Sequence, residues 1–166
     1  MFTVGILICS DKGSRGERVD QSGEVIKGVM TRLGARVVRY EIVPDDPPVI
    51  SAALKRWADQ DRLDLILTSG GTGLSPRDHT PEATLSVIDR QAPGISEAIR
   101  AESLKKTPRA MLSRGVAGTR GRCLIINLPG SPRAVQECLD VLIPALPHGI
   151  EILTGRASEC AREQDH

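Results

Sequence analysis

The stretch LDLILTSGGTGLSPRDHTPEATL at residues 63–85 contains, in succession, an apolar run, a glycine-rich turn, an aspartate and a helix start. The apolar residues at 65–67 are typical of a strand that is buried on both faces of a sheet. The turn at residues 70–73 reads GGTG, and glycine permits positive φ angles or a close approach of the backbone to a ligand. Amide groups in such a turn can bind phosphate oxygens. We therefore expect an anion-binding loop at the carboxyl end of a strand.

The second half of this stretch adds a carboxylate and a helix. Asp78 lies on the same loop, and Thr80 directly precedes Pro81. Threonine favours the N-cap position, and proline at the first helical position loses no hydrogen bond. The pattern predicts a helix that begins at Pro81, with amide donors and a carboxylate brought together just before it.

The rest of the chain alternates strand and helix patterns. Strands are predicted at residues 4–10, 35–43 and 123–128, with a possible hairpin over 115–128, and helices at 21–33, from Pro47, at 95–105 and at 132–142. Such alternation predicts the α/β class, in which helices cover both faces of a mostly parallel sheet. We find no internal repeat and no linker, so residues 1–166 are expected to form one domain with a polar tail after about residue 159.

Small and acidic residues follow four of the predicted strands. Ligands of parallel sheets bind outside the carboxyl ends of the strands, so these residues are expected to share one site. They are Ser10 and Asp11 after the first strand, Asp45 and Asp46 after the second, Ser69, Gly70, Gly71, Thr72, Gly73 and Asp78 after the third, and Asn127, Pro129, Gly130 and Ser131 after a later one.

Composition argues against several classes of protein. The chain has 166 residues and a formal net charge of +1, with only one Phe, one Trp and one Tyr. A balanced charge without a basic stripe, and so few aromatic side chains for base stacking, disfavour nucleic-acid binding. No apolar run reaches membrane-spanning length, and the N-terminus lacks a basic segment before its short apolar stretch. We expect a cytoplasmic protein that does not bind membranes.

The cysteines do not have the spacing of a metal site. Cys9, Cys123, Cys138 and Cys160 lie far apart in the chain, and the first two fall within apolar strand patterns. We interpret Cys9 and Cys123 as small core residues.

The glycine loop matches neither of two common nucleotide-binding motifs. It lacks the GK[ST] ending of a P-loop, and it lacks GxGxxG opening directly into a helix. With these two motifs excluded, we expect a phosphate-bearing ligand that backbone amides and Thr72 hold, together with a divalent cation that carboxylates bind. Mg²⁺ fits this chemistry because it takes few protein carboxylates and bridges substrate phosphates. Asp45 and Asp78 are the candidate Mg²⁺ ligands, whereas Asp46, just before Pro47, is expected to cap the helix.

The combined motifs resemble a known family. ICSDKGSRG at the start, TSGGTG with RDHTPEAT in the middle and NLPGSP near the end are similar to the molybdenum-cofactor biosynthesis proteins of the MogA and MoaB type. The resemblance covers almost the whole chain. It implies an α/β/α sandwich of the molybdopterin-binding fold, a homotrimer, and molybdopterin adenylyltransferase activity that uses Mg²⁺ and ATP. The product of that activity would pass to a molybdenum insertase.

By position, the resemblance assigns roles to individual residues. Asp45 and Asp78 correspond to the carboxylates associated with magnesium and adenylyl transfer, and the GGTG turn corresponds to the nucleotide and phosphate loop. Ser10, Asp11, Gly130 and Ser131 match motifs that line the same pocket. His79 departs from the small apolar residue that the family often has there.

Two other functions stay open at this point. The carboxyl-terminal part is short compared with longer MogA-type chains, which makes a non-catalytic MoaB-type carrier or scaffold for molybdopterin an alternative. Retention of both Asp45 and Asp78 favours an active enzyme. A nucleotide pyrophosphatase is a third possibility, because a related domain occurs in competence-damage-type proteins.

Overall fold

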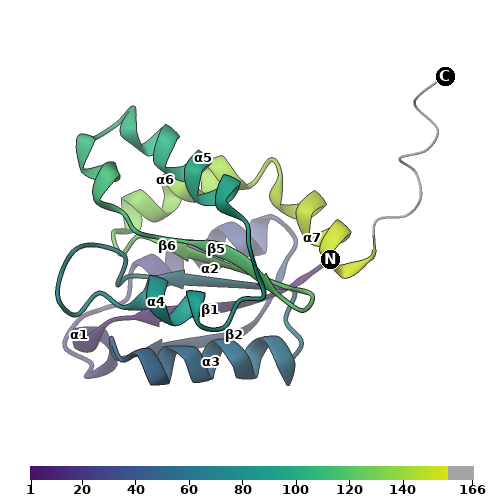
Figure 1. Cartoon of the computed structure of the whole chain (residues 1–166), viewed down its shortest axis with the longest axis horizontal. Helices are drawn as coiled ribbons and strands as arrows, with labels where there is room; N and C mark the ends of the chain where they lie inside the picture. The colour runs from purple at the N-terminus through teal and green to yellow at the C-terminus, as the bar shows by residue number, and fades with distance from the viewer. Residues whose placement is uncertain (157–166) are drawn as a thin grey trace.

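The computed structural model describes residues 1–156 of the chain, and its centre is a six-stranded sheet (Figure 1). The strand order is β2-β1-β3-β6-β5-β4, in which the first four strands are parallel and β5 pairs antiparallel with both β6 and β4. The strands are β1 (Thr3–Cys9), β2 (Arg36–Val43), β3 (Leu65–Ser69), β4 (Arg90–Gln91), β5 (Ala117–Arg120) and β6 (Cys123–Leu128). The predicted polar tail after about residue 159 lies outside the described residues.

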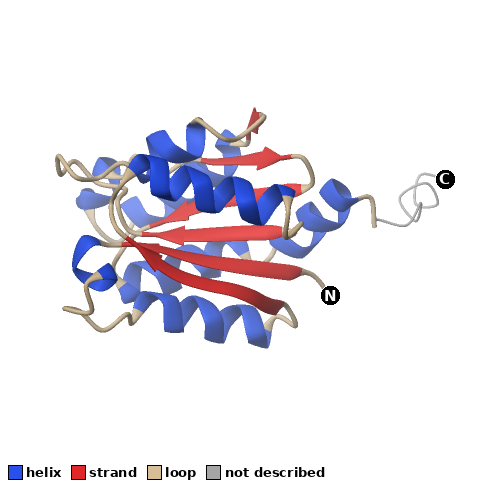
Figure 2. Cartoon of the chain, turned by 90° about the horizontal axis from the view of Figure 1, so that it is seen from below, coloured by secondary structure: helices blue, strands red, loops and turns tan. Residues whose placement is uncertain are grey.

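Helices cover both faces of this sheet, which confirms the predicted three-layer architecture (Figures 1 and 2). One layer contains α2 (Ser22–Arg32), α5 (Pro93–Leu104), α6 (Pro132–Leu142) and α7 (Leu146–Thr154), and the other contains α3 (Pro47–Asp59) and α4 (Thr80–Leu85). The short helices α1 (Asp11–Ser14) and η1 (Pro108–Leu112) lie in connections. No helix of residues 1–156 is long and apolar enough to cross a membrane.

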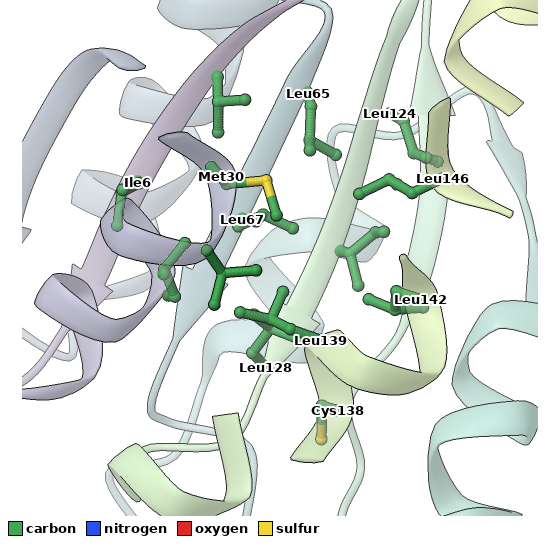
Figure 3. Packing of buried hydrophobic residues seen from close by; sticks show 14 of the residues in the cluster. Ile6, Met30, Leu65, Leu67, Leu124, Leu128, Cys138, Leu139, Leu142 and Leu146 are labelled. Atoms are coloured by element: carbon green, nitrogen blue, oxygen red, sulfur yellow. The ribbon is translucent and has the colours of Figure 1, made fainter. Parts of the chain in front are cut away.

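Alternate residues of the central strands pack into two separate cores. On one face Ile6 and Leu67 belong to one buried cluster with Met30 of α2 and Leu139 of α6, part of which Figure 3 shows. On the other face Trp57 of α3 is fully buried against the sheet. Cys9 and Cys123 belong to this second core, and burial raises the pKa of each thiol to about 12. Both therefore stay neutral and act as small apolar residues, as predicted.

The register of the parallel strands brings their carboxyl ends to one edge. Ile8 pairs with Ser69, and Ser69 pairs with Leu128. The chain runs from β1 to β2 on one side and then returns to β3 on the other side of β1. This reversal of direction is the topological switch point at which ligands of open α/β sheets bind.

Three short elements were missing from the sequence-based prediction. The segment after β1 has no helical pattern in the sequence, yet Ser10 caps the single turn of α1 by accepting a hydrogen bond from Gly13 N over 3.0 Å. Helix α7 follows α6 so closely that only residues 143–145 separate them, and Gly155 at φ +72° ends it. The two residues of β4 pair with the edge of β5 and carry too little sequence pattern to predict.

Two predicted helix caps differ in detail. Thr80 is the first residue of α4 rather than its cap, and His79 takes the N-cap position. Asp46 does occupy the N-cap of α3, but its side chain makes no capping hydrogen bond. Pro48 removes one of the two amides, that of the second helical position, to which an N-cap side chain can bond.

Candidate functional site

A cavity of about 770 Å³ lies at the switch point of the sheet, outside the carboxyl ends of β1 and β3. The glycine loop and the end of β2 form part of its wall, and the segment 18–22 before α2 forms another part. In Figure 1 the long loop between β3 and α4 projects on the same side of the molecule as α1. The cavity is thus built by segments that are far apart in sequence.

Most of the predicted site residues line this cavity. They are Ser10, Asp45, Ser69, Gly70, Gly71, Asp78, Gly130 and Ser131. Asp11, Thr72, Gly73, Asn127 and Pro129 lie close by in the chain but are not among the lining residues. Each of these five instead contacts or supports the walls, as the hydrogen bonds below show.

Asp45 has one carboxylate oxygen engaged and one without a partner. Its Oδ2 accepts a hydrogen bond from the amide of Asp11 over 3.0 Å. Its Oδ1 is buried and has no hydrogen-bond partner within residues 1–156. Burial raises the pKa of Asp45, and the negative charges of Asp11 and Asp78 act in the same direction, although the Asp11 amide opposes the shift. A buried carboxylate oxygen without a donor is well suited to a cation.

Asp11 supports the wall of the cavity through an ion pair. Both of its oxygens accept hydrogen bonds from the guanidinium of Arg77, each over 3.0 Å. These bonds hold the pKa of Asp11 below its usual range. Arg77 belongs to the glycine loop, so the pair fastens that loop to the end of β1. Sequence reasoning did not single out Arg77.

The glycine loop brings Asp78 and Asp45 to the same cavity. Gly70 has φ +95° and Gly71 has φ +67°, conformations that only glycine adopts readily. A Cβ on Gly70 would collide with the carbonyl of Cys9, so the loop passes tightly over the end of β1. Oδ2 of Asp78 accepts a hydrogen bond from Ser75 N over 3.0 Å, which closes a turn within the loop.

The turn after β6 forms the opposite wall. Ser69 Oγ donates to the carbonyl of Pro129 over 2.8 Å, and Gly70 N donates to the carbonyl of Leu128 over 3.1 Å. Ser131 caps α6, as its sequence pattern predicts, by accepting a hydrogen bond from Ala134 N over 3.4 Å. The glycine loop and this turn are therefore joined directly.

Asn127 lies beneath the site rather than in it. The side chain is buried, its Nδ2 donates to the hydroxyls of Thr68 and Thr84 over 3.0 and 2.9 Å, and its Oδ1 accepts from Val116 N over 3.2 Å. All of these partners belong to the protein. The geometry gives Asn127 the role of a connector between β6, β3 and α4.

One wall of the cavity was not predicted. Residues 18–22 line it, and Asp20 fixes their conformation by accepting hydrogen bonds from Gly23 N, the Ser22 hydroxyl and the Tyr40 hydroxyl. Burial is the main cause that raises the pKa of Tyr40, and the hydrogen bond to Asp20 and the charge of Asp20 raise it further. This polar segment has no strand or helix pattern of its own, so nothing in the sequence places it over the ends of other strands.

A second cavity of about 510 Å³ adjoins the first and shares Ser131 with it. Its lining comes from α5, η1 and α6. Four basic side chains and one acidic side chain line it: Arg100, Lys106, Arg109, Arg133 and Glu137. Such an excess of positive charge favours an anionic ligand.

Residues 1–156 contain no group of three or more His, Cys, Asp and Glu side chains arranged to hold a metal ion. The described part of the chain therefore does not indicate a metal site whose ligands are all protein side chains. Mg²⁺ needs only one or two carboxylates when substrate phosphates and water complete its shell. Asp45, with its unpaired oxygen, and Asp78 fit that requirement.

Comparison with known proteins identifies the family. A family model described as "Probable molybdopterin binding domain" matches residues 5–148. The chain belongs to this family. It is 42% identical over 154 residues to the molybdopterin adenylyltransferase of Helicobacter pylori strain J99, covering 92% of this chain and 88% of that relative. The protein of the same name from Escherichia coli K12 is 34% identical, with 96% and 89% covered.

Solved structures of this molybdopterin-binding family share the fold. The molybdopterin biosynthesis enzyme MoaB from Thermus thermophilus is 55% identical, with a TM-score of 0.89 over 93% of this chain and 98% of that one. The family and fold class predicted from the sequence motifs are thereby confirmed. The relatives from Helicobacter pylori and Escherichia coli also carry the name of the activity that the resemblance implies.

Proposed function

We propose that this chain is a molybdopterin adenylyltransferase, formed by a single domain. A terminal phosphate oxygen of molybdopterin would attack the α-phosphorus of ATP. The bond from that phosphorus to the oxygen bridging to the β-phosphate would break, and pyrophosphate would leave with its electron pair. The observation that carries the proposal is Asp45, a carboxylate with one buried, unpaired oxygen that shares a cavity with the glycine loop and Asp78.

The residues of the first cavity suit the phosphates of ATP. The backbone amide of Gly71 would supply a donor without any charge of its own, while that of Gly70 stays bonded to Leu128. Asp45 and Asp78 would hold Mg²⁺. When bound, Mg²⁺ supplies positive charge that neutralises the phosphates. Phosphoryl-type transfer depends on such positioning and charge stabilisation more than on a covalent contribution from the protein.

The second cavity suits the pterin substrate. Molybdopterin carries the phosphate that must reach the α-phosphorus, so its site has to adjoin the ATP site. The second cavity meets this condition through Ser131, and its basic lining complements an anionic ligand. Ser131 would then lie where the two substrates meet.

An adenylylation assay tests the proposed activity. Purified protein, molybdopterin and Mg-ATP should yield adenylylated molybdopterin and pyrophosphate in equal amounts. Asp78→Ala should abolish turnover and leave molybdopterin binding largely intact, whereas Asp140→Ala, an exposed change on α6, serves as the control. Absence of product at high enzyme concentration would refute the proposal.

A second candidate is a non-catalytic carrier that binds molybdopterin and hands it to another protein. The observation in its favour is the 55% identity to a MoaB structure. A carrier has no need for ATP, so calorimetric titration of ATP in the presence of Mg²⁺ separates the two functions. Saturable, Mg²⁺-dependent ATP binding supports the enzyme, and molybdopterin binding without it supports the carrier.

The resemblance to the family also supports three statements about context. We infer a homotrimer, a cytoplasmic location and a molybdenum insertase as the recipient of the product. Sedimentation of the purified chain tests the first. A pull-down of an insertase, with and without Mg-ATP and molybdopterin, tests the last.

A further inference from the structure

Arg114 holds both ends of the glycine loop. This residue lies between η1 and β5, directly after Ser113 of the second cavity. Its amide donates to the carbonyl of Thr72 over 2.8 Å, and its Nε donates to the carbonyl of Gly73 over 2.8 Å. Its Nη2 donates to the carbonyl of Asp78, also over 2.8 Å. One arginine thus anchors the loop before and after its exposed part.

The part of the loop between these anchors has few other attachments to the body of the protein. Residues 74–77 are exposed. The hydrogen bond from Ser75 N to Asp78 is internal to the loop. The pair between Arg77 and Asp11 does reach the body, but Arg77 is 61% exposed, and exposed pairs of this kind stabilise little. Arg114, at 33% exposure, is the less exposed of the two arginines.

Arg114 is itself fixed from the second cavity. Nη1 of Arg100 donates to the carbonyls of Ser113 and Gly115, over 3.5 and 2.9 Å, on either side of Arg114. Arg100 lines the second cavity. Arg100 thus fixes the backbone on both sides of Arg114, whose guanidinium in turn binds the backbone of Asp78 at the first cavity.

We propose that Arg114 is a positioning residue for adenylyl transfer, which places the Asp78 carboxylate by holding the backbone of the loop that carries it. The proposal rests on the proposed function of the two cavities. The flat guanidinium can donate to two carbonyls and to the Glu82 carboxylate at once, whereas a lysine ammonium lacks this fixed fork. Replacement by lysine would keep the charge and the backbone bond to Thr72, and would lose the paired bonds to the carbonyls of Gly73 and Asp78.

The test compares Arg114→Lys with Arg120→Lys. Arg120 is a matched control because its guanidinium also binds a carboxylate, that of Asp59, and a backbone carbonyl, that of Val87. Unlike Arg114, it makes no hydrogen bond to the glycine loop. For Arg114→Lys we expect kcat to fall by about 10- to 100-fold. We also expect the Mg²⁺ concentration for half-maximal ATP binding to rise by about 10-fold or more. Arg120→Lys should change neither quantity.

The Mg²⁺ concentration for half-maximal ATP binding separates positioning from a purely structural role. A general loss of stability lowers the amount of folded protein but leaves this concentration unchanged for the molecules that are folded. Melting curves of both variants establish that they are folded at the assay temperature. Glu82→Gln removes the charged partner and keeps the carbonyl contacts, so it should change kcat much less than Arg114→Lys. An unaltered Mg²⁺ dependence in Arg114→Lys overturns the proposal even if the wild-type chain shows no turnover. A wild-type chain without turnover refutes only the proposed function.

Discussion

Asp11 and Asp45 each bind the backbone amide of the other. The Asp11 amide donates to Oδ2 of Asp45, and the Asp45 amide donates to Oδ1 of Asp11, both over 3.0 Å. These two bonds join the end of β1 to the end of β2. The first bond engages Oδ2 of Asp45, and the buried Oδ1 has no hydrogen-bond partner within residues 1–156. Asp11 is therefore expected to act through Asp45.

Removal of the Asp11 side chain tests this relationship. Asp11→Ala removes the acceptor of the Asp45 amide and the partner of Arg77, so adenylyl transfer should fall by about 10- to 100-fold through misplacement of Asp45. Asp11→Asn keeps an acceptor oxygen and should lose less. The loss in each variant is measured as the steady-state rate of adenylyl transfer at saturating substrate. Glu17→Ala, which breaks an exposed pair with Arg15, is the control, and equal rates for Asp11→Ala and this control would contradict the role of Asp11.

The raised pKa of Asp45 predicts a pH-dependent stability difference. Since burial raises the pKa in the folded state above that of the unfolded chain, ionisation of Asp45 destabilises the fold. This cost is absent below the unfolded pKa, about 4, grows as pH rises to the folded pKa and is constant above it. Asp45→Asn should therefore melt at a higher temperature than the wild type at pH 7 and at a similar temperature at pH 3.

Melting curves over this pH range, recorded without Mg²⁺, check the prediction. The same variant should lose adenylyl transfer, because it no longer offers an anionic oxygen to the cation. Asp46→Asn, at the next position of the same turn, is the matched control. A wild-type protein more stable than Asp45→Asn at pH 7 would show that the unpaired oxygen is not a burden to the fold.

The buried connector Asn127 gives a prediction about stability rather than chemistry. Asn127→Ala leaves the amide of Val116 without its side-chain acceptor and removes the donor shared by two threonine hydroxyls. Loss of such buried partners costs about 1–3 kcal/mol of the free energy of unfolding. Urea denaturation measures this loss. The KM values for both substrates should stay close to those of the wild type at a temperature where the variant is folded, and a large rise in either would place Asn127 in substrate binding instead.

The sequence predicted the fold well because its signals are local. Apolar runs such as residues 65–67 and 123–128 are strands buried on both faces, and a parallel sheet necessarily brings their carboxyl ends to one edge. The acidic and glycine-rich turns after these strands therefore meet in one cavity. Asp45 and Asp78 line the same cavity although 33 positions separate them in the chain.

The parts that sequence reasoning missed depend on contacts between distant segments. Arg114 lies in a loop without any motif, and its importance comes from carbonyl groups at residues 72–78 that only the folded chain brings near. Residues 18–22 likewise become a wall through Asp20 and Tyr40, two residues on different elements. Asn127 belongs to a recognisable motif, but burial decides that its side chain faces protein.

Substitution of Gly70 by alanine tests whether the site depends on the close approach of the glycine loop to the end of β1. Its φ of +95° already disfavours any other residue, and a Cβ would collide with the Cys9 carbonyl. Gly34 also has a positive φ, +81°, but a Cβ there meets nothing within 4 Å. Gly34→Ala should thus cost about 1–2 kcal/mol from the left-handed conformation alone. Gly70→Ala should cost at least about 3 kcal/mol, because the collision is added to that strain.

Denaturant unfolding of both variants gives the two costs, and rates at a temperature where both are folded give the functional effect. Gly70 directly precedes Gly71, which lies beside Asp45. An alanine side chain at position 70 can avoid the Cys9 carbonyl only if the loop backbone and its amides move. Gly70→Ala should therefore lose adenylyl transfer by about 100-fold, and Gly34→Ala should retain it. Equal stability losses in the two variants would mean that the loop relaxes away from β1 without strain, and retained activity in Gly70→Ala would remove the amides of this turn from phosphate binding.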